Sequence, residues 1–267
     1  DIFMGISVHF DLPDSALGTK EYFDLFAKLY NLSLLGMNLG NDSEGNGEQF
    51  VAEYILNKTR GGGAITLFDV GANVGKYTQM LRKIFPDAQI HSFEPGHATF
   101  QTLQQNVKNC NAILNNFGLS NSHKKLTLHY DKEESGLASL YNRQLDYYNI
   151  DYSKSETVTV DTLDFYCARN GIEQIDLLKM DVEGAEIDVL DGAAHMLEEH
   201  RIKAIQFEFG GCNLDSRTFF RDFWNRLHES YRMYRILRDG FIEIQNYTEK
   251  LEIFSYQNIF CEIREEN

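Results

Sequence analysis

The sequence predicts an α/β protein whose core is a doubly wound, mostly parallel sheet. Short apolar segments alternate with longer amphipathic ones between residues 64 and 116, and the same rhythm returns between 175 and 231. The amphipathic segments are too long for hairpin turns and suit crossover helices, which parallel strands require. The strand-like segments after residue 231 follow one another without a helix, which predicts an antiparallel strand at the C-terminal end.

The residues before this pattern predict a helical extension. Aromatic and aliphatic side chains recur at helical spacing from Tyr22 to Tyr30, which is typical of an amphipathic helix over 19–35 with one face against a core. A polar, glycine-rich loop is expected over 40–49, and a second helix follows it. We therefore expect a helical extension over 1–60 and an α/β domain over 61–267.

The α/β domain is expected to contain one insertion, over about 121–160, where the alternation lapses. Two strands flank a polar, tyrosine-rich segment there. The expected strands are 64–70, 88–94, 112–116, 124–130, 156–163, 175–182, 202–209, 232–239, 240–245 and 258–263. The expected helices of the domain are 75–85, 97–110, 185–200 and 216–231.

Composition and charge exclude several classes of function. A chain of 267 residues with 43% hydrophobic and 24% charged residues is typical of an ordinary globular protein. The formal net charge of −15 argues against a nucleic-acid partner, because that binding depends on clustered Lys and Arg. Polar residues interrupt the apolar stretch 25–39, and no basic segment or small-residue cleavage site frames it, so we expect neither a membrane span nor a signal peptide.

The four cysteines lack the CxxC spacing of zinc sites and redox pairs. We therefore expect free thiols and a cytoplasmic protein. The chain begins with Asp1 instead of methionine, which is expected of a fragment or a processed form.

The loop DVGANVG, residues 69–75, is the first candidate ligand site. A dinucleotide-binding loop would have the spacing GxGxxG. If Gly71 is the first glycine, Asn73 and Lys76 occupy the other two glycine positions, so the match fails. The acid at the strand end, Asp69, suits a ligand with an ammonium group, such as an amino-acid moiety, better than a pyrophosphate.

Acidic residues also follow other predicted strands. Glu94 lies roughly 20 residues past the loop, where an acid can accept hydrogen bonds from both hydroxyls of a ribose. The alternative for Glu94 is a solvated carboxylate at the end of a strand. Glu208 lies in an apolar strand just before two glycines, and a carboxylate buried there would need a partner.

A charged cluster follows the predicted strand 175–182. Lys179, Asp181 and Glu183 lie at the carboxyl end of this central strand, where open α/β sheets bind ligands. The alternative is that the acids only complement the dipole of the helix that follows.

Together these motifs resemble one known family. The chain contains, in order, the segments LFDVGANVGKYT, HSFEPG, TVDTLDFY and IDLLKMDVEGAEIDVLDGA. In this it resembles the FkbM-type family of S-adenosylmethionine-dependent methyltransferases, over about residues 48–263. The resemblance implies a Rossmann-like class I methyltransferase domain over 61–267, with S-adenosylmethionine as its cofactor.

The resemblance also implies which residues bind the methionine half of the cofactor. Asp69, Gly71, Ala72 and Asn73 would form the loop against that half, and Thr78 would lie near its carboxylate.

For the rest of the cofactor, the resemblance implies a second group of residues. Glu94 would bind the ribose hydroxyls and Pro95 would pack near the adenine. Asn116 and Phe117 would border the adenine ring, and Asp181 would face the amino end of the cofactor and the acceptor pocket.

Methyl transfer to a hydroxyl requires a base that takes the hydroxyl proton. The candidates are Asp181, Glu183 and Glu208, with Lys179 behind them. In an alternative arrangement, Asp181 and Glu208 hold a Mg²⁺ ion that acidifies the acceptor oxygen. No metal ligand is assigned.

The expected function is therefore O-methylation of a sugar hydroxyl or a natural-product scaffold, such as a polyketide or glycoside. A nicotinamide-dependent oxidoreductase and a catalytically silent binding domain are the two alternatives. We expect a small-molecule or glycan acceptor and no nucleic-acid or membrane partner. The tyrosine-rich insertion is expected to be a lid or an acceptor-binding surface, or else to pack onto the sheet. The helix over 19–35 is expected to contact the core or a second copy in a homodimer.

Overall fold

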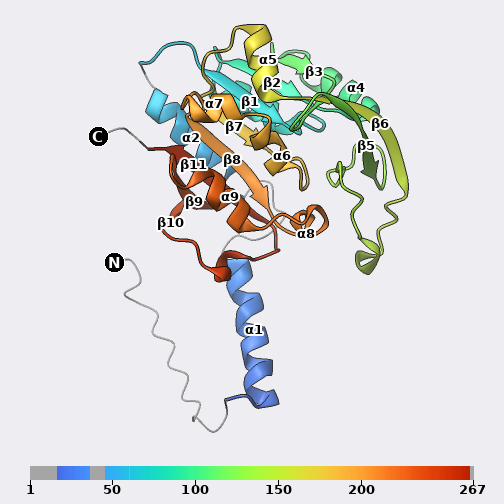
Figure 1. Cartoon of the computed structure of the whole chain (residues 1–267), viewed down its shortest axis with the longest axis vertical. Coiled ribbons are helices and arrows are strands. Elements are labelled where there is room, and N and C mark those ends of the chain that lie inside the picture. The colour runs from blue at the N-terminus through green and yellow to red at the C-terminus, as the bar shows by residue number, and fades with distance from the viewer. Residues whose placement is uncertain (1–16, 37–45, 60, 265–267) are drawn as a thin grey trace.

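The computed structural model describes residues 17–36, 46–59 and 61–264. The main body of the protein is an eight-stranded sheet with the order β10-β9-β11-β8-β7-β1-β2-β3 (Figure 1). Its strands are β1 (Thr66–Val70), β2 (Gln89–Phe93), β3 (Ile113–Asn115), β7 (Leu177–Met180), β8 (Ala204–Phe209), β9 (Tyr231–Leu237), β10 (Gly240–Ile244) and β11 (Gln257–Ile263). The helices are α1 (Lys20–Gly36), α2 (Glu48–Thr59), α3 (Lys76–Ile84), α4 (His97–Asn106), α5 (Leu163–Asn170), α6 (Glu186–Asp191), α7 (Ala194–Glu198), α8 (Cys212–Ser216) and α9 (Phe220–Leu227).

The pairing of the strands confirms the predicted fold class. The strands β3, β2, β1, β7 and β8 pair in parallel. The strand β11 is antiparallel to both β8 and β9, and β9 is antiparallel to β10. Because β1 lies between β2 and β7, the loops that follow these three strands open at the same edge of the sheet.

The helices cover both faces of the sheet because neighbouring residues of a strand point to opposite sides. Leu67 of β1 packs with Val51 of α2 and Leu81 of α3. Phe68, the next residue, packs in a second cluster with Phe223 of α9 and with residues of α5, α6 and α7. Two apolar layers therefore hold the sheet between the helices.

The insertion forms a second, three-stranded sheet beside the main one (Figure 1). Its strands are β4 (Gly118–Leu119), β5 (Lys124–Tyr130) and β6 (Lys154–Asp161). The segment between β5 and β6 contains a short 3-10 helix, Asp146–Tyr148. Both strands that the sequence predicts within the insertion are present.

The predicted single helix over 185–200 is wrong. The chain forms two short helices there, α6 and α7, which are separated at Gly192. A Cβ atom at Gly192 would lie 2.0 Å from the carbonyl oxygen of Ser120, so the backbone at the break packs directly on the chain that follows β4. The carbonyl of Gly192 accepts a hydrogen bond from the backbone N–H of Asp164 at 2.9 Å.

The two N-terminal helices differ in how they pack. The helix α1 confirms the prediction over 19–35, but its aromatic side chains are exposed, Phe23 at 64% and Phe26 at 53%. The predicted burial of this face against the core is wrong within the described residues, and the homodimer contact stays a prediction. In contrast, α2 buries Val51, Ala52 and Ile55 against the sheet.

Two other predictions concern the same region. Of the predicted loop 40–49, residues 40–45 lie outside the described residues, and α2 already begins at Glu48. None of the helices in the described ranges has the length and apolarity needed to cross a membrane.

Candidate active site

A cavity of about 1320 Å³ lies at the carboxyl ends of the parallel strands. It is lined by the loops after β1 and β2, by the end of β7, by Glu208 of β8 and by the segment that joins β5 to β6. Cavities for one drug-sized ligand hold roughly 300–1,000 Å³. The cavity is therefore large enough for two small molecules side by side.

The loop after β1 is held tightly against the end of β7. Gly71 has a φ of 80°, and a Cβ atom there would lie only 1.9 Å from the carbonyl oxygen of Asp181. The backbone N–H groups of Gly71 and Ala72 both donate to the carbonyl of Phe93, at 3.0 and 2.9 Å. Gly71, Ala72 and Asn73 all line the cavity, as the sequence predicts for a cofactor loop.

Glu94 joins this loop to the next one. Its carboxylate accepts hydrogen bonds from the backbone N–H groups of Asn73 at 3.0 Å and Gly96 at 2.8 Å. The side chain lines the cavity although only 7% of the residue is exposed. Burial raises the pKa of Glu94 to about 7, and the two backbone hydrogen bonds oppose that shift. Pro95, the next residue, also lines the cavity.

Asp69 and Thr78 lie beneath the wall of the cavity instead of on it. Both are fully buried and neither lines the cavity. The Thr78 hydroxyl donates to Asp69 Oδ2 at 2.6 Å, and Lys179 Nζ lies 3.7 Å from Asp69 Oδ1. The ammonium group beside Asp69 is thus that of Lys179, which the spacing of the sequence could not show. Asp69 and Thr78 therefore support the loop from beneath, and their predicted contact with the cofactor stays a prediction.

Lys179 is the centre of a buried charged group. Its Nζ lies 3.3 Å from Asp181 Oδ2 and 4.9 Å from the ring centre of Tyr77. Burial alone would lower the pKa of Lys179, but the carboxylates of Asp181, Asp69 and Glu48 outweigh it and raise that pKa. These carboxylates favour the protonated form of Lys179, which cannot take a proton, so Lys179 is the weakest of the candidate bases.

The two residues predicted beside the adenine do not line the cavity. Asn116 is exposed, and its Nδ2 donates to the carbonyl oxygen of Glu94 at 2.9 Å. Phe117 packs edge-on against Phe93, with ring centres 5.6 Å apart. Their neighbours Gly118 and Leu119 line the cavity instead. Asn116 and Phe117 thus support the wall, and their direct contact with the adenine stays a prediction.

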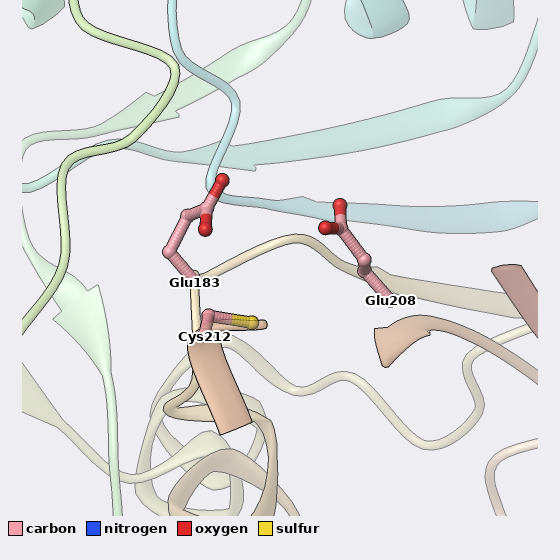
Figure 2. Close-up of side chains that lie close together, drawn as sticks. All are labelled: Glu183, Glu208 and Cys212. Atoms are coloured by element: carbon pink, nitrogen blue, oxygen red, sulfur yellow. The ribbon is translucent and has the colours of Figure 1, made fainter. Parts of the chain in front are cut away.

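Glu183 and Glu208 come together at the other side of the cavity, and Cys212 lies beside Glu183 (Figure 2). One ligand atom from each of the three lies within 4.8 Å of the others. Glu183 forms an ion pair with Arg143. Within the described ranges, the carboxylate of Glu208 makes no hydrogen bond or ion pair. Burial and the nearby Asp181 and Glu183 raise the pKa of Glu208 well above its usual range.

The same three residues are poorly suited to Mg²⁺. That ion prefers oxygen ligands, and burial raises the pKa of the Cys212 thiol, so the sulfur keeps its proton. Asp181, which the sequence predicts as a partner of Glu208 in a metal site, lies outside this group and faces Lys179. We assign no metal to the site.

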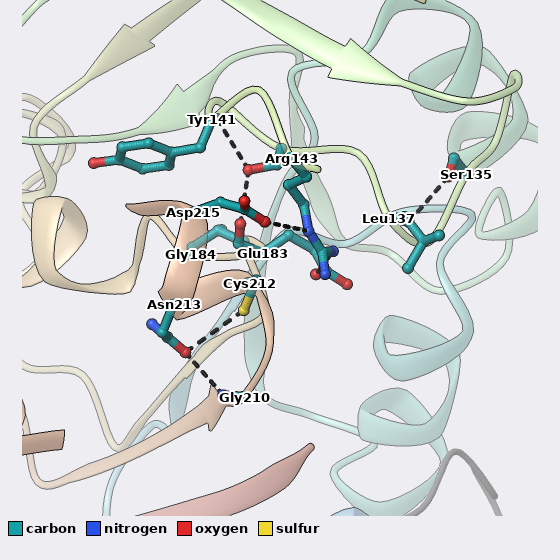
Figure 3. Close-up of polar contacts among 12 residues, drawn as sticks. Ser135, Leu137, Tyr141, Arg143, Glu183, Gly184, Gly210, Cys212, Asn213 and Asp215 are labelled. Atoms are coloured by element: carbon teal, nitrogen blue, oxygen red, sulfur yellow. Dashed lines mark hydrogen bonds and ion pairs between the residues drawn. The ribbon is translucent and has the colours of Figure 1, made fainter. Parts of the chain in front are cut away.

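The segment between β5 and β6 closes over both sides of the cavity. Asn73 Nδ2 donates to the carbonyl of Ser135 at 2.9 Å, and the Ser139 hydroxyl donates to the carbonyl of Glu183 at 2.7 Å. Arg143 reaches Glu183 from the same segment (Figure 3). The insertion therefore touches the loop after β1 and the loop after β7 together.

The four tyrosines between residues 141 and 152 of the insertion form two pairs. Tyr147 and Tyr148 line the cavity, are exposed at 62% and 66%, and have ring centres 4.5 Å apart. The hydroxyl of Tyr141 donates to Asp188 at 2.8 Å, and that of Tyr152 donates to the carbonyl of Leu137 at 2.6 Å. The first pair can contact a ligand, and the second pair anchors the insertion.

Several residues that line the cavity were missed by the sequence reasoning, among them Glu48, Tyr77, Arg143 and Tyr256. Only Arg143 carried a usable signal, since it is the one basic residue between Lys132 and Lys154. Glu48 comes from α2, and Tyr256 comes from the segment before β11. Neither position has a local pattern that points to a ligand.

Comparison with known proteins agrees with this geometry. The family described as "Methyltransferase FkbM domain" matches residues 69–236. "Methyltransferase 1" of Beauveria bassiana is 30% identical over 142 residues, which are 47% of this chain and 57% of that protein. "Methyltransferase sdnD" of Sordaria araneosa is 30% identical over 161 residues, covering 50% and 61%. "2-O-methyltransferase NoeI" of Sinorhizobium fredii is 27% identical over 145 residues, covering 51% and 60%.

The aligned part is therefore less than two thirds of each of these three relatives. Among solved structures, the plantazolicin methyltransferase BpumL in complex with SAH superposes with a TM-score of 0.43 and 9% identity, over 94% of this chain and 93% of that one.

Proposed function

The chain belongs to the FkbM methyltransferase family, and on that premise we propose that it transfers the methyl group of S-adenosylmethionine to a hydroxyl of a sugar or natural-product acceptor. The observation that carries this proposal is the cavity of about 1320 Å³. It has a glycine-bearing loop and Glu94 at one side and Glu208 at the other, and the Glu208 carboxylate has no partner among the described residues. The relative named 2-O-methyltransferase supports oxygen as the acceptor atom.

The residues at the first side fit S-adenosylmethionine. Because Gly71 has no side chain, the loop after β1 packs directly against the backbone of Asp181 and lines the cavity beside it. The Glu94 carboxylate lies at the wall, where it could accept hydrogen bonds from ribose hydroxyls. When bound, S-adenosylmethionine supplies an activated methyl group on a positively charged sulfur. The carboxylates of Asp181 and Glu94 would suit its amino group and ribose respectively.

Glu208 is the best placed base for the acceptor. Its carboxylate lines the cavity and has no hydrogen-bond or ion-pair partner in the part of the chain that the structure describes. In contrast, Glu183 is paired with Arg143, and the neighbouring carboxylates favour the protonated form of Lys179. Burial and the neighbouring acids raise the pKa of Glu208, which makes its ionised form a stronger base. Glu208 would take the hydroxyl proton while the walls of the cavity hold the acceptor oxygen in line with the methyl group.

The acceptor would bind against the insertion. Leu137, Leu140 and Leu145 line that part of the cavity together with Tyr147 and Tyr148. Tyrosine faces offer an apolar surface with a polar tip, which suits sugar rings and flat scaffolds.

The test is to incubate the protein with methyl-labelled S-adenosylmethionine and a panel of glycans, glycosides and macrolides. Labelled products are then identified by mass spectrometry, with and without a chelator. Isothermal titration calorimetry with S-adenosylmethionine and with nicotinamide dinucleotides separates the proposal from an oxidoreductase. A catalytically silent domain would bind the first cofactor and label no acceptor.

The base is tested with Glu208→Gln. Turnover should fall by about 10²- to 10⁴-fold, the usual contribution of a general base, while calorimetry shows unchanged cofactor binding. Glu229→Gln, at an exposed glutamate outside the cavity, is the matched control and should keep full activity. Methylation at the normal rate in Glu208→Gln would remove Glu208 from the chemistry.

A further inference from the structure

One buried arginine connects the insertion to the edge of the main sheet. Arg143 Nη1 donates to Glu183 Oε2, and its Nε lies 3.6 Å from Asp215 Oδ2 (Figure 3). The side chains of Arg143, Glu183 and Asp215 are only 9%, 11% and 15% exposed. Exposed ion pairs contribute little to stability, but breaking a buried pair leaves an uncompensated charge. Because the pair is buried, its loss should have a large effect on the stability of this contact.

Further contacts from the insertion converge on the same two acids. The backbone N–H of Gln144 donates to Asp215 Oδ1 at 3.2 Å. The Ser139 hydroxyl donates to the carbonyl oxygen of Glu183 at 2.7 Å, while its own oxygen accepts from the backbone N–H of Tyr141 at 3.0 Å. Glu183 is thus held at its side chain and at its backbone by one segment.

The backbone conformation of Glu183 explains why it needs contacts at both its side chain and its backbone. Its φ is 52°, in the left-handed region that residues other than glycine adopt at an energetic cost. Strained residues of this kind persist only where the surroundings fix them, and they cluster at functional sites. The contacts from Ser139 and Arg143 supply that restraint.

The acidic residues around Glu183 explain why a positively charged side chain, Arg143, lies beside it. Glu183 and Glu208 lie close together in the wall of the cavity, with Asp181 and Glu186 nearby. Two neighbouring carboxylates disfavour each other's ionised form. Burial and the nearby Asp181 raise the pKa of Glu183 to about 8, and the guanidinium of Arg143 opposes that shift. Among the described residues, Glu208 has no such cationic partner.

We propose that Arg143 is a positioning residue that fastens the insertion over the cavity and fixes Glu183 in one orientation, so that Glu208 is the carboxylate left free to act on the acceptor. This inference rests on the proposed function for its catalytic consequence. The fastening of the insertion can be tested on the protein alone.

The first experiment measures hydrogen exchange of the protein without ligand. In Arg143→Gln, exchange of the amides in 135–148 should accelerate by at least about tenfold, because one partner of a buried pair is lost. Amides in β1 and β2 should keep their protection, which shows that the variant is folded. Arg169→Gln, at an exposed arginine outside the cavity, is the matched control and should exchange like the original protein. Unchanged exchange in 135–148 of Arg143→Gln would overturn the proposal.

A double variant tests whether Arg143 acts through Glu183. Glu183→Gln alone should also speed exchange in 135–148, and Arg143→Gln combined with Glu183→Gln should exchange no faster than the more affected single variant. Effects that simply multiply would show that the two residues act independently, and the proposal would then be wrong.

Rates of methyl transfer by two Arg143 variants distinguish the effect of the positive charge of Arg143 from that of its planar geometry. Arg143→Lys keeps the positive charge but loses the planar fork, so kcat should fall while the acid limb of the pH–rate profile stays in place. Arg143→Gln also removes the charge, which raises the pKa of the neighbouring acids and moves that limb to higher pH. The KM for S-adenosylmethionine should be unchanged in both variants.

The two proposals fail in different ways. If no acceptor is methylated by the original protein, the proposed function fails, and the exchange data still decide whether Arg143 fastens the insertion. If the Arg143→Gln variant methylates the acceptor at the normal rate and its pH profile is unshifted, Arg143 has no positioning role. The proposed function still stands in that case.

Discussion

At the scale of single residues, Glu94 is a carboxylate whose charge depends on pH near neutrality. Burial raises its pKa from an ordinary value of 4.5 to about 7. Because the folded protein holds this proton more tightly than the unfolded chain, the contribution of Glu94 to stability is full below pH 4.5 and is lost as the pH rises through about 7. The sugar hydroxyls of a cofactor would instead favour the ionised carboxylate as an acceptor.

We therefore predict that the affinity for S-adenosylmethionine increases as the pH rises through about 7. Calorimetric titrations at pH values on either side of 7 measure the change. In Glu94→Gln the affinity should be lower, and the part of the pH dependence that comes from Glu94 should disappear. Burial also raises the pKa of Glu186 to about 7. Glu186 is present in both proteins and contributes equally to the pH dependence of binding, so the difference in that dependence between the two proteins comes from Glu94. An identical slope in both proteins would contradict the assignment.

The individual acids of the site were visible in the sequence, but their partners were not. Strand-end positions place Glu94, Asp181 and Glu208 correctly at one cavity. The spacing could not show that Asp69 is paired with Lys179, because the two meet only when β1 lies beside β7. It likewise gave no means to find Arg143 as the partner of Glu183, since the insertion has no fixed register against the main sheet.

At the scale of elements, the contact between the loop after β1 and the end of β7 is the tightest in the site. Gly71→Ala would place a Cβ atom 1.9 Å from the carbonyl oxygen of Asp181, so backbone must move. Gly61 is a matched control because its φ of +83° is similar but nothing lies within 4 Å of a Cβ there. Gly61→Ala should cost about 1–2 kcal/mol for left-handed backbone alone.

Gly71→Ala should cost roughly 1–3 kcal/mol more than that control, the usual penalty of overpacking. It should also weaken binding of S-adenosylmethionine, because the cofactor loop is displaced from its place beside Asp181. Chemical denaturation and calorimetry measure the two effects. Equal losses of stability in both variants would mean that the loop has room to adjust and that the close approach is unimportant.

The elements themselves were largely predictable because their burial follows regular periods. The central parallel strands are short, mostly apolar segments whose residues are nearly all buried, as strands covered on both faces should be. The prediction of a single helix over 185–200 was wrong because the helical periodicity of the sequence continues through Gly192. The break at Gly192 depends on a contact with Ser120, which is far away in the chain. The predicted burial of the apolar face of α1 was wrong because periodicity identifies an apolar stripe but does not show what the stripe contacts.

At the scale of the whole molecule, the cavity draws its wall from segments spread along most of the domain. Glu48 of α2, the loops after β1, β2 and β7, the insertion and the segment before β11 all contribute. No short motif could have shown this, because only the order of the strands in the sheet brings the segments together. The helix α2 is part of that wall, although the predicted division of the chain assigns it to the extension.

This arrangement predicts that the folded unit begins before α2 instead of at residue 61. The helix buries Val51 and Ile55 fully or nearly so in the layer formed by β1 and α3. Burying one large aliphatic side chain stabilises a protein by roughly 1.5–3 kcal/mol, so two of them are a large share of the about 5–15 kcal/mol that holds a typical protein folded. A chain that starts at residue 61 should therefore be unfolded or far less stable.

A chain that starts at residue 46 keeps α2 and loses the exposed helix α1. Its thermal unfolding midpoint and its affinity for S-adenosylmethionine should match those of the full chain. The chain that starts at residue 61 should also bind the cofactor weakly even where it folds, because the Glu48 carboxylate beside Lys179 is missing from the wall. If that shorter chain unfolds at the same temperature as the full one, the boundary predicted at residue 61 is correct and the packing of α2 contributes little to stability.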